Sequence, residues 1–407
     1  MKNVVVLGSG FAGLWAAVGA ARRLDELQIP LGDVGVTVIS SQPFHDIRVR
    51  NYEPDLTACR IPLSDVLDPV GVAHITADVT AIDTAARTVT ISDTNGVGSQ
   101  DYDRLVFALG SSVAIPDLPG LREFGFDVDT YDNAIRLSRH LAALADGPPT
   151  PGAATAVVVG AGLTGIEVAC DLPGRLVGLL TGRDGYTPRV LLIDHNRFVG
   201  SDMGDSARPL IEAALADNGV EALTGVGVAA VDADGVTLST GQRVAASTVV
   251  WCAGMRANAL TALFGIELDR LGRLPVDDYL RVVGVPGVFA AGDVAAAKVD
   301  DQHLSVMSCQ HGRPMGRYAG YNVVSDLLGE SMLTLRIPWY VTVLDLGPAG
   351  AVYTEGWDRQ VVTHGTQAKA TKRVINTERI YPPLGGDRAE ILAAAAPELQ
   401  ARPARGR

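Results

Sequence analysis

Cysteine is scarce in this chain of 407 residues, and the cysteines lie far apart in the sequence. They are Cys59, Cys170, Cys252 and Cys309. Because no two of them form a Cys-x-x-Cys pair, their spacing indicates neither a zinc site nor a disulfide framework. We therefore expect no bound metal and no redox pair of neighbouring cysteines.

Long apolar runs are missing as well, although 47% of the residues are hydrophobic. No run reaches the roughly 18 residues that a membrane-spanning helix requires. The N-terminus begins with a strand pattern instead of a signal peptide. These absences predict a cytoplasmic protein. At most, an Ala-rich surface helix over 389–400 or a disordered basic tail over 401–407 makes weak peripheral contact with a membrane.

Positive charge is in deficit, since 34 Lys and Arg residues face 46 Asp and Glu residues, for a formal net charge of -12. A chain of this charge is repelled by nucleic acid, so no nucleic-acid partner is expected. The composition is otherwise typical of a globular protein, and the length predicts two or three domains.

The opening of the chain has the order strand, glycine-rich turn, helix. Residues 2–7 are apolar and β-branched, which is typical of a buried parallel strand, and an Ala-rich helix is expected over 14–24. Between them, Gly8 permits a tight turn, Gly10 lets the backbone approach a phosphate, and Gly13 lets helix and strand pack closely. The pattern predicts a dinucleotide pyrophosphate site at the helix N-terminus, with a purely structural turn as the alternative.

The next strand, expected over 34–40, ends at Ser40, where dinucleotide-binding folds commonly have an acidic residue that binds the adenosine ribose. A serine hydroxyl still hydrogen-bonds a ribose, with less strength than a carboxylate. In the polar loop that follows, Arg48 and Arg50 are candidates to bind a phosphate or an acidic substrate. A solvated loop is an equal alternative for both arginines.

The opening pattern returns after a Pro- and Gly-rich linker over 147–152. A strand is expected over 156–159, and Gly160, Gly162 and Gly165 then provide a second turn with the same spacing. An internal repeat of this unit implies two nucleotide sites in one chain.

An acidic residue ends the following strand of the second unit, which is expected over 190–194. Asp194 lies where a carboxylate accepts a hydrogen bond from the 2′-hydroxyl of NADH and repels the 2′-phosphate of NADPH. Arg197 follows closely and can offset this repulsion, so the sequence favours NADH over NADPH without excluding the latter.

Three later strands end in glycine turns. Apolar runs lead into Gly110 and Gly254, and a third run over 287–290 leads into Gly292 and Asp293. A single Asp after a strand is usually a turn residue, but beside two nucleotide turns we interpret Asp293 as a cofactor contact.

With these motifs, the chain resembles the FAD-dependent pyridine nucleotide oxidoreductases that have two dinucleotide-binding domains. Among them it is similar above all to the type II NADH dehydrogenases and the apoptosis-inducing-factor-like flavoproteins. The resemblance is carried by the two glycine turns, Tyr102-Asp103, Glu167, Trp251 with Gly254, and Ala291-Gly292-Asp293.

The resemblance implies an α/β fold with two Rossmann-like dinucleotide-binding domains and a small C-terminal α+β domain. The FAD-binding domain is expected over 1–118 and 275–330, the NAD(P)H-binding domain over 119–274, and the C-terminal domain with its tail over 331–407. In the last domain we expect Trp339, Trp357 and Tyr381 in the core, and Lys369 and Lys372 on a solvated face.

The resemblance also implies the cofactor contacts. Those expected for FAD are Gly8, Gly10, Phe11, Ala12, Gly13, Ser40, Arg48, Val79, Ala108, Gly110 and Asp293. Those expected for NAD(P)H are Gly160, Gly162, Gly165, Asp194 and Gly254, and Glu167 is expected beside the nicotinamide. NADH would pass hydride to the flavin, which would then reduce a small-molecule acceptor.

Type II dehydrogenases pass the electrons to a quinone, and their quinone side carries an Ala-Gln pair followed by a Gln-Gln pair. Here Gln310 matches the first glutamine, whereas Pro314 and Met315 replace the second pair. Gln310 and His311 are candidates to contact the acceptor, with a structural role as the equal alternative. The leading interpretation is an NADH:quinone reductase.

Other functions stay open on the sequence alone. A reductase of an electron-carrier protein such as a ferredoxin or rubredoxin needs a basic docking patch, for which Arg48, Arg50, Arg313 and Arg317 are candidates. A flavoprotein that senses NADH with slow turnover is a second alternative. A sulfide:quinone reductase would need a partner for Cys309. A homodimer is possible.

Overall fold

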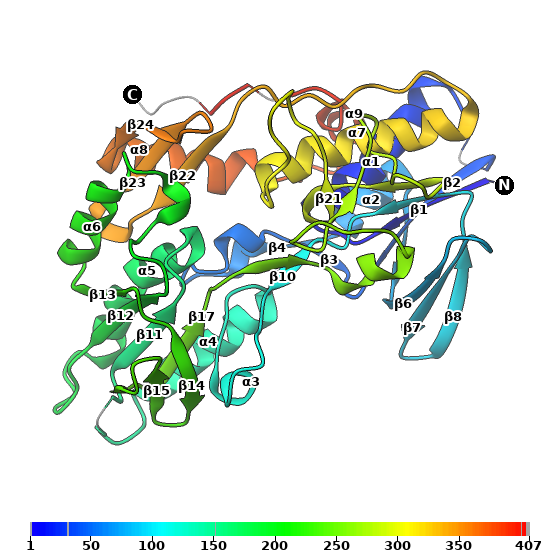
Figure 1. Cartoon of the computed structure of the whole chain (residues 1–407). Helices are drawn as coiled ribbons and strands as arrows, with labels where there is room; N and C mark the ends of the chain where they lie inside the picture. Colours follow the sequence, from blue (N-terminus) through cyan, green and yellow to red (C-terminus); the bar gives the residue numbers. More distant parts are fainter. Residues whose placement is uncertain (1, 31, 151, 400, 404–407) are drawn as a thin grey trace.

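The computed structural model describes residues 2–30, 32–150, 152–399 and 401–403. The chain forms two parallel sheets with helices around them and a third, antiparallel sheet near the C-terminus (Figure 1). This arrangement confirms the predicted α/β fold with two Rossmann-like units. The domain boundaries themselves stay a prediction.

The first parallel sheet has the strand order β20-β9-β1-β2-β5. Its strands are β1 (Lys2–Leu7), β2 (Val34–Ser40), β5 (Ala73–Thr76), β9 (Arg104–Phe107) and β20 (Val288–Ala290). The strands predicted over 2–7 and 34–40 are thus confirmed. The sheet combines distant parts of the chain, because β20 pairs with β9 although more than 180 residues separate them.

Two helices cover one face of this sheet. They are α1 (Phe11–Glu26) and α7 (Cys309–Leu328), which lie side by side (Figure 1). The first helix begins directly after the first glycine turn, with Gly10 at its N-cap and no side chain capping it. A Gly-rich loop followed by a helix whose first N–H groups have no intrahelical partners is a local anion site.

A separate antiparallel sheet projects from one corner of the molecule (Figure 1). Its strands are β6 (Asp78–Asp83), β7 (Thr88–Asp93) and β8 (Gly96–Asp101). The stretch 75–82 is divided at Ala77 between β5 of the parallel sheet and β6. The divided stretch leaves one sheet and enters another, which the hydrophobic pattern of one strand does not reveal.

The second parallel sheet has the order β13-β12-β11-β17 and repeats the arrangement of the first. Its strands are β11 (Thr155–Val159), β12 (Arg189–Asp194), β13 (Val220–Thr224) and β17 (Thr248–Trp251). Its helices are α4 (Tyr131–Leu144), α5 (Leu163–Leu180) and α6 (Arg208–Asp217). A small antiparallel sheet of β14 (Val228–Asp232), β15 (Gly235–Leu238) and β16 (Arg243–Ala245) is attached.

Short elements connect the two units. The pairs are β3 (Phe44–Asp46) with β4 (Arg60–Pro62), β10 (Ser111–Val113) with β18 (Met255–Ala257), and β19 (Leu274–Pro275) with β21 (Ala295–Ala296). The short helices are α2 (Ser64–Leu67) and α3 (Leu121–Phe124). The β10–β18 pair joins the strand that leaves the first sheet to the strand that leaves the second, so both sheets meet at this ribbon.

The third sheet is antiparallel, with the order β22-β23-β24. It consists of β22 (Val341–Asp345), β23 (Ala351–Glu355) and β24 (Gln360–His364), followed by α8 (Gly365–Val374) and a π-helical turn over Ile375–Arg379. In Figure 1 this sheet lies near α5 of the second unit.

The last helix, α9 (Arg388–Ala394), returns to the first unit and contacts α1. We expected a surface helix over 389–400. The helix is shorter, and its Ile391 and Leu392 are buried, so it is part of the core. Residues 400 and 404–407 of the predicted helix and tail lie outside the described residues. Among the described helices, none is long and apolar enough to cross a membrane.

Candidate active site

The first glycine turn is shaped by the protein at two glycines and left open at the third. Gly8 has φ +99°, and a Cβ added there would lie 2.4 Å from the carbonyl oxygen of Ala108. A Cβ on Gly13 would lie 1.9 Å from the carbonyl oxygen of Gly8. A Cβ on Gly10 would meet no protein atom within 4 Å. Packing therefore explains Gly8 and Gly13, whereas Gly10 leaves space above the helix N-terminus that fits a phosphate group.

The second turn repeats this geometry. Gly160 has φ +105°, and its added Cβ would lie 2.9 Å from Ala253. An added Cβ on Gly165 would lie 1.8 Å from the carbonyl oxygen of Gly160. At Gly162 the nearest atom is an Oδ2 of Asp202 at 3.4 Å, in ordinary van der Waals contact. Both turns thus offer an open backbone surface at the same position of the motif.

Each turn opens into a cavity, and the two cavities share part of their walls. The smaller, of about 260 Å³, is lined by Gly10, Phe11, Ala12, Ala108, Gly110 and Asp293 among others. The larger, of about 840 Å³, is lined by Gly160, Gly162, Glu167, Asp194, Gly254 and Gln310 among others. Arg48, Cys252 and Cys309 belong to both walls. The structure therefore brings most of the sequence-predicted site residues into one continuous hollow.

Other predicted contacts lie outside these walls. Gly8, Gly13 and Gly165 support the turns from behind, and Val79 packs against the core of the first unit. The hydroxyl of Ser40 donates to the carbonyl oxygen of Gln42 at 2.7 Å and lies 2.9 Å from Nε2 of His74. Ser40 is therefore engaged within the protein at the end of β2.

Asp194 ends β12 directly opposite the second glycine turn. Its Oδ2 accepts a hydrogen bond from the Ala161 N–H at 2.5 Å, and its Oδ1 accepts from the Asn196 N–H at 2.7 Å. The side chain is only 7% exposed but lines the larger cavity. Arg197 packs over the ring of Phe198, and no ion pair between Arg197 and Asp194 is present among the described residues. A fixed negative charge therefore faces the space above the second turn.

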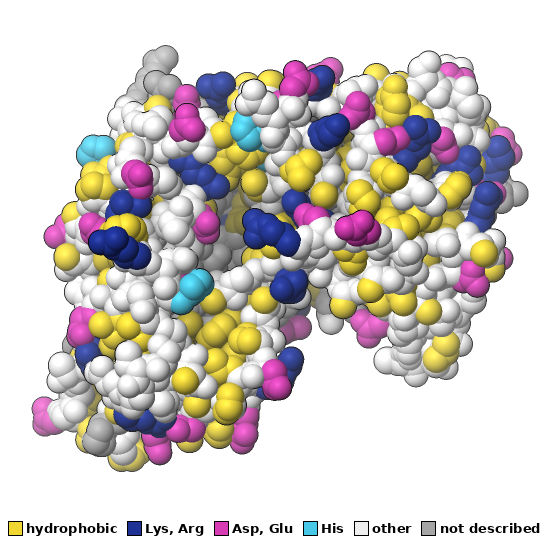
Figure 2. All heavy atoms as spheres, viewed as in Figure 1, with side chains coloured by type: hydrophobic (Ala, Val, Ile, Leu, Met, Phe, Trp, Pro, Cys, Tyr) yellow, Lys and Arg dark blue, Asp and Glu magenta, His cyan; other side chains and the backbone are white. Residues whose placement is uncertain are grey.

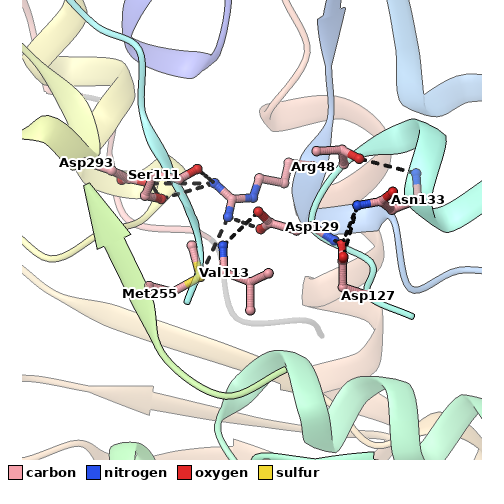
Figure 3. A network of polar contacts seen from close by, with 9 residues as sticks. Arg48, Ser111, Val113, Asp127, Asp129, Asn133, Met255 and Asp293 are labelled. Atoms are coloured by element: carbon pink, nitrogen blue, oxygen red, sulfur yellow. Dashed lines mark hydrogen bonds and ion pairs between the residues drawn. The ribbon is translucent and has the colours of Figure 1, made fainter. Parts of the chain in front are cut away.

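Arg48 is the centre of a polar network between the two units (Figure 3). It forms an ion pair with Asp129, donates to the carbonyl oxygen of Ser111 at 2.9 Å, and lies 3.9 Å from Asp293. Asp129 in turn accepts from the Val113 N–H at 2.8 Å. The solvated-loop alternative for Arg48 is thus wrong, because the network joins β10 to the segment before α4.

Asp293 lies at the end of this network and in the wall of the smaller cavity. Burial raises the pKa of its carboxyl group, while the hydrogen bond from Ser111 Oγ at 2.6 Å and the charge of Arg48 act in the opposite direction. A carboxylate held in this way is an acceptor suited to hydroxyl groups of a ligand.

Glu167 and Lys372 form a buried ion pair in the wall of the larger cavity. Nζ of Lys372 lies 2.7 Å from Oε1 of Glu167, and their side chains are 11% and 9% exposed, respectively. Burial raises the pKa of Glu167 and Lys372 partly offsets this effect. For Lys372, burial opposes the charge, but Glu167 raises the pKa of the ammonium group above its ordinary value.

The lysines of α8 were expected on a solvated face, and that expectation is wrong for Lys372. Lys369 also has an acidic partner, since its ammonium group pairs with Asp345. Asp345 accepts from Tyr52 Oη as well, at 3.1 Å. Both lysines of α8 thus meet acidic partners, Lys372 one from α5 and Lys369 one from β22, and Lys372 is the one that is buried.

Of the two residues predicted to contact the acceptor, Gln310 lies in the cavity wall and His311 lies behind it. Gln310 lines the larger cavity, and its side-chain Nε2 is buried with no hydrogen-bond partner among the described residues. His311 is fully buried behind the wall, and its Nδ1 accepts from the Val306 N–H at 2.9 Å. Burial lowers the pKa of His311 to about 4, so the ring is neutral at pH 7. Of the two residues, Gln310 is therefore the one whose side chain faces the cavity.

Three aromatic residues of the C-terminal part were expected in the core. Trp357 packs against the core and stacks on Tyr340, with ring centroids 4.7 Å apart. Tyr381 donates from Oη to the carbonyl oxygen of Ala58 at 2.6 Å and lies partly buried. Trp339, however, lines the larger cavity, so it is also a wall residue.

The comparison with protein families decides the identity of the chain. The model of the pyridine nucleotide-disulphide oxidoreductase family matches residues 2–316, which include both glycine turns and the Gly-Asp turn at 292–293. The chain belongs to this family. Pyridine nucleotide-disulphide oxidoreductases use FAD and NAD(P)H, and this chain is accordingly a flavin-dependent NAD(P)H oxidoreductase of the family.

Individual members of the pyridine nucleotide-disulphide oxidoreductase family are similar over nearly the whole chain. An NADH dehydrogenase-like protein of Mycobacterium tuberculosis is 70% identical over 99% of this chain and 100% of its own length. A type II NADH:quinone oxidoreductase of Staphylococcus haemolyticus is 27% identical over 95% and 96%. The fold matches that of NDH2 from Plasmodium falciparum, solved in complex with NADH, with a TM-score of 0.78, 13% identity and 97% coverage of both chains.

Several site residues of this family member were not found from the sequence. Lys372 was missed because its partner Glu167 is 205 positions away. Asp129 lies in a loop and Ser111 begins the short strand β10, and neither position belongs to a recognisable motif. For Trp339 the residue type was itself a signal, because Trp combines a large apolar body with a polar N–H and is common at binding interfaces as well as in cores.

Proposed function

We propose that this chain is an FAD-dependent NADH oxidoreductase that passes electrons to a quinone or a quinone-like small molecule. One observation carries the proposal. Two glycine turns of the same geometry, on separate sheets, open into two cavities that share a wall. Two dinucleotides bound at these turns could bring their reactive rings together at the shared wall, as hydride transfer requires.

The residues of the first turn would hold the FAD. The open surface at Gly10 and the free N–H groups of α1 suit its pyrophosphate. Asp293 would accept hydrogen bonds from its ribityl hydroxyls, with Arg48 and Ser111 keeping the carboxylate in place. When bound, the flavin takes up hydride from NADH and delivers two electrons to the acceptor.

The second turn would hold the NADH, within a domain that we propose to span residues 119–274. The charge of Asp194 faces the position of the adenosine ribose, which favours a 2′-hydroxyl over a 2′-phosphate. Glu167 lies in the same cavity, further along α5, at the place that we assign to the nicotinamide end.

Lys372 and Glu167 would hold a proton at the junction between the two nucleotide sites. Because Lys372 also donates to the carbonyl oxygen of Val343 at 3.1 Å, its ammonium group has a fixed direction. This ion pair would orient the Glu167 carboxylate near the nicotinamide. Because the two charges cancel, the pair adds no net charge to the cavity. The side chains of Lys372 and Glu167 are only 11% and 9% exposed, and this burial strengthens each of these contacts.

A quinone-like acceptor is supported by the larger cavity. Ile337, Trp339, Ile375 and Ile380 line it, and they offer a surface for a flat aromatic ring. Gln310 provides a buried amide that lacks a partner among the described residues and can donate to a carbonyl oxygen of the ring. Pro314 and Met315 replace the second glutamine pair, and this difference from the type II dehydrogenases counts against a quinone.

A protein acceptor is less well supported. Arg48 and Arg50 are bound to Asp129 and Glu53, and Arg313 and Arg317 are buried, so these four arginines form no exposed docking patch. On the face shown in Figure 2, acidic and basic side chains are interspersed. These four arginines therefore do not provide the basic docking patch that a reductase of an electron-carrier protein needs.

The test is an anaerobic absorbance titration of the purified protein. We expect a flavin spectrum that bleaches with NADH more readily than with NADPH and that recovers when 2-methyl-1,4-naphthoquinone is added. Bleaching without recovery would contradict a quinone acceptor and favour a sensor or a protein acceptor. A protein with no flavin spectrum, even after incubation with FAD, would contradict the whole proposal.

A further inference from the structure

Arginines gather at one end of the larger cavity. Arg313 and Arg317 reach its wall from α7, and Arg379 reaches it from the π-helical turn after α8. The acidic residues of the same wall are Glu167, Asp194 and Asp202, all from the second unit. Among the described residues, the end of the cavity built by α7 and the C-terminal elements is therefore cationic, although the chain as a whole has a net charge of -12.

Arg317 is the most unusual of these arginines. It is 3% exposed, and its guanidinium lies over the ring of Trp15, 4.4 Å from the centroid. No carboxylate among the described residues pairs with it, and its Nε has no hydrogen-bond partner there. Burial lowers its pKa to about 9, with the neighbouring charge of Arg313 as a second cause. The fold thus keeps a guanidinium in a place where its charge is poorly compensated.

Physical chemistry restricts what such a group is for. A buried charge is costly unless a counter-ion or a set of hydrogen bonds compensates it, and a stack on an indole ring supplies only part of that compensation. The planar fork of an arginine suits the bidentate binding of a carboxylate, sulfonate or phosphate. An anion that enters the cavity would therefore gain a strong partner, and it would relieve the electrostatic penalty of Arg317.

The wall next to these arginines is apolar. Ile337, Ile375, Ile380 and Leu399 lie in the same cavity as Arg317. A ligand that fits both features has a flat apolar body and one anionic group at its edge. The volume of about 840 Å³ accommodates such a molecule together with part of a dinucleotide.

We propose that Arg317, with Arg313 beside it, binds an anionic group of the electron acceptor, so that the acceptor is an aromatic, quinone-like molecule that bears a carboxylate or a sulfonate. This inference rests on the proposed function only in treating the bound molecule as the electron acceptor. It concerns binding and includes no chemical step. It makes Arg317 a specificity-determining residue that distinguishes anionic from neutral ring compounds.

The test uses a pair of redox-inert probes on the flavin-loaded protein. Isothermal titration calorimetry would compare naphthalene-2-carboxylate with naphthalene-2-carboxamide, which has the same shape without the charge. We expect the carboxylate to bind about tenfold more tightly or better. In Arg317→Met this preference should fall to about twofold or less, and Arg317→Lys should keep part of it because the charge remains.

Arg23→Met is the matched control. Arg23 also lies between α1 and α7 and stacks on an aromatic ring, that of Tyr321 at 4.3 Å, but it is outside the cavity wall. This variant should keep the preference for the carboxylate. Equal binding of the two probes to the unchanged protein would overturn the proposal, and so would loss of the preference in Arg23→Met.

The flavin content of Arg317→Met gives a further outcome. If the variant is purified without flavin, Arg317 serves the FAD phosphates and the proposal is wrong. Because the probes accept no electrons, the binding result does not depend on turnover. A failure of every quinone to re-oxidise the flavin would therefore contradict the proposed function alone, whereas indifference to probe charge would contradict this inference alone.

Discussion

Lys372 of α8 meets Glu167 of α5 in a buried ion pair, with 2.7 Å between Nζ and Oε1. The pair connects α8, which follows the C-terminal sheet, to α5, which begins at the second glycine turn. It also stands in the wall of the cavity that we assign to both the nicotinamide and the acceptor. Structure and proposed catalysis thus depend on the same two side chains.

Replacing Lys372 with methionine should destabilise the protein strongly. The substitution leaves the Glu167 carboxylate buried without its partner, which typically lowers the free energy of unfolding by about 3–5 kcal/mol. The double variant Glu167→Gln with Lys372→Met should be less destabilised than Lys372→Met alone, because no uncompensated charge remains. Urea unfolding of the three proteins at pH 7 measures this difference, and equal losses in both variants would contradict the buried-charge explanation.

Gly10→Ala should fold normally and lose its flavin. An added Cβ at Gly10 meets no protein atom within 4 Å, so the thermal midpoint of the flavin-free protein should stay close to that of the unchanged chain freed of flavin. The same Cβ occupies the space that we assign to the pyrophosphate. The visible absorbance of the flavin in the purified protein measures the loss. A fully yellow Gly10→Ala protein would show that the first turn binds nothing at this position.

Gly13→Ala is the informative counterpart. Its Cβ would lie 1.9 Å from the carbonyl oxygen of Gly8, so the strand and helix would have to separate. We expect this variant to be unstable with or without FAD, by about 2 kcal/mol or more, as is usual for overpacking in a tight core. Circular dichroism during heating distinguishes the two glycine variants.

Asp194→Ser should reduce the preference for NADH over NADPH. The serine removes the charge that repels a 2′-phosphate but can keep a hydrogen bond to the Ala161 N–H. We expect the ratio of kcat/KM for NADH over NADPH to fall by about tenfold, which corresponds to about 1.4 kcal/mol. Steady-state rates with both nucleotides and one quinone give this ratio. An unchanged ratio would mean that another residue selects the nucleotide.

Acid should destabilise the protein between about pH 6.5 and pH 4. Burial lowers the pKa of His45 and of His311 from 6.5 to about 4 in each case. In this window the unfolded chain binds protons that the folded chain does not, so stability falls as the pH falls. Each histidine contributes on the order of 3 kcal/mol at most. Urea midpoints at pH 7 and pH 4.5 measure the loss.

His311→Asn is the control for this pH dependence. Its side-chain oxygen can accept from the Val306 N–H as Nδ1 of His311 does, and it does not titrate. The variant should therefore lose less stability than the unchanged protein when the pH is lowered. An identical pH dependence in both proteins would assign the effect to other groups.

The sequence allowed the two glycine turns and their strands to be predicted because the signal is local. Three glycines at fixed spacing, an apolar strand before them and a helix after them are all read within about 20 residues. Asp194 and Asp293 follow from the same frame, since Asp194 ends a strand and Asp293 lies in the turn that follows one. The strand order of both parallel sheets agrees with this interpretation.

The remaining site residues could not be predicted, because their partners are remote in the sequence. Lys372 lies in a helix whose composition is typical of a solvated face, and only its contact with Glu167 shows otherwise. Arg317 follows a glycine in a polar stretch and becomes a buried cation only because α7 packs along α1 beside Trp15. Charge patterns along one segment do not reveal tertiary pairing.

The route of the chain through the first sheet has a consequence for biosynthesis. The second sheet is complete once Trp251 has been made, whereas the first still needs β20, and its covering helix α1 needs α7 and α9. During synthesis on the ribosome, the second parallel sheet would therefore be completed before the first, although the first begins earlier in the chain. The helix α1 after the first glycine turn would therefore lack its packing against α7 and α9 until the last helix has left the ribosome.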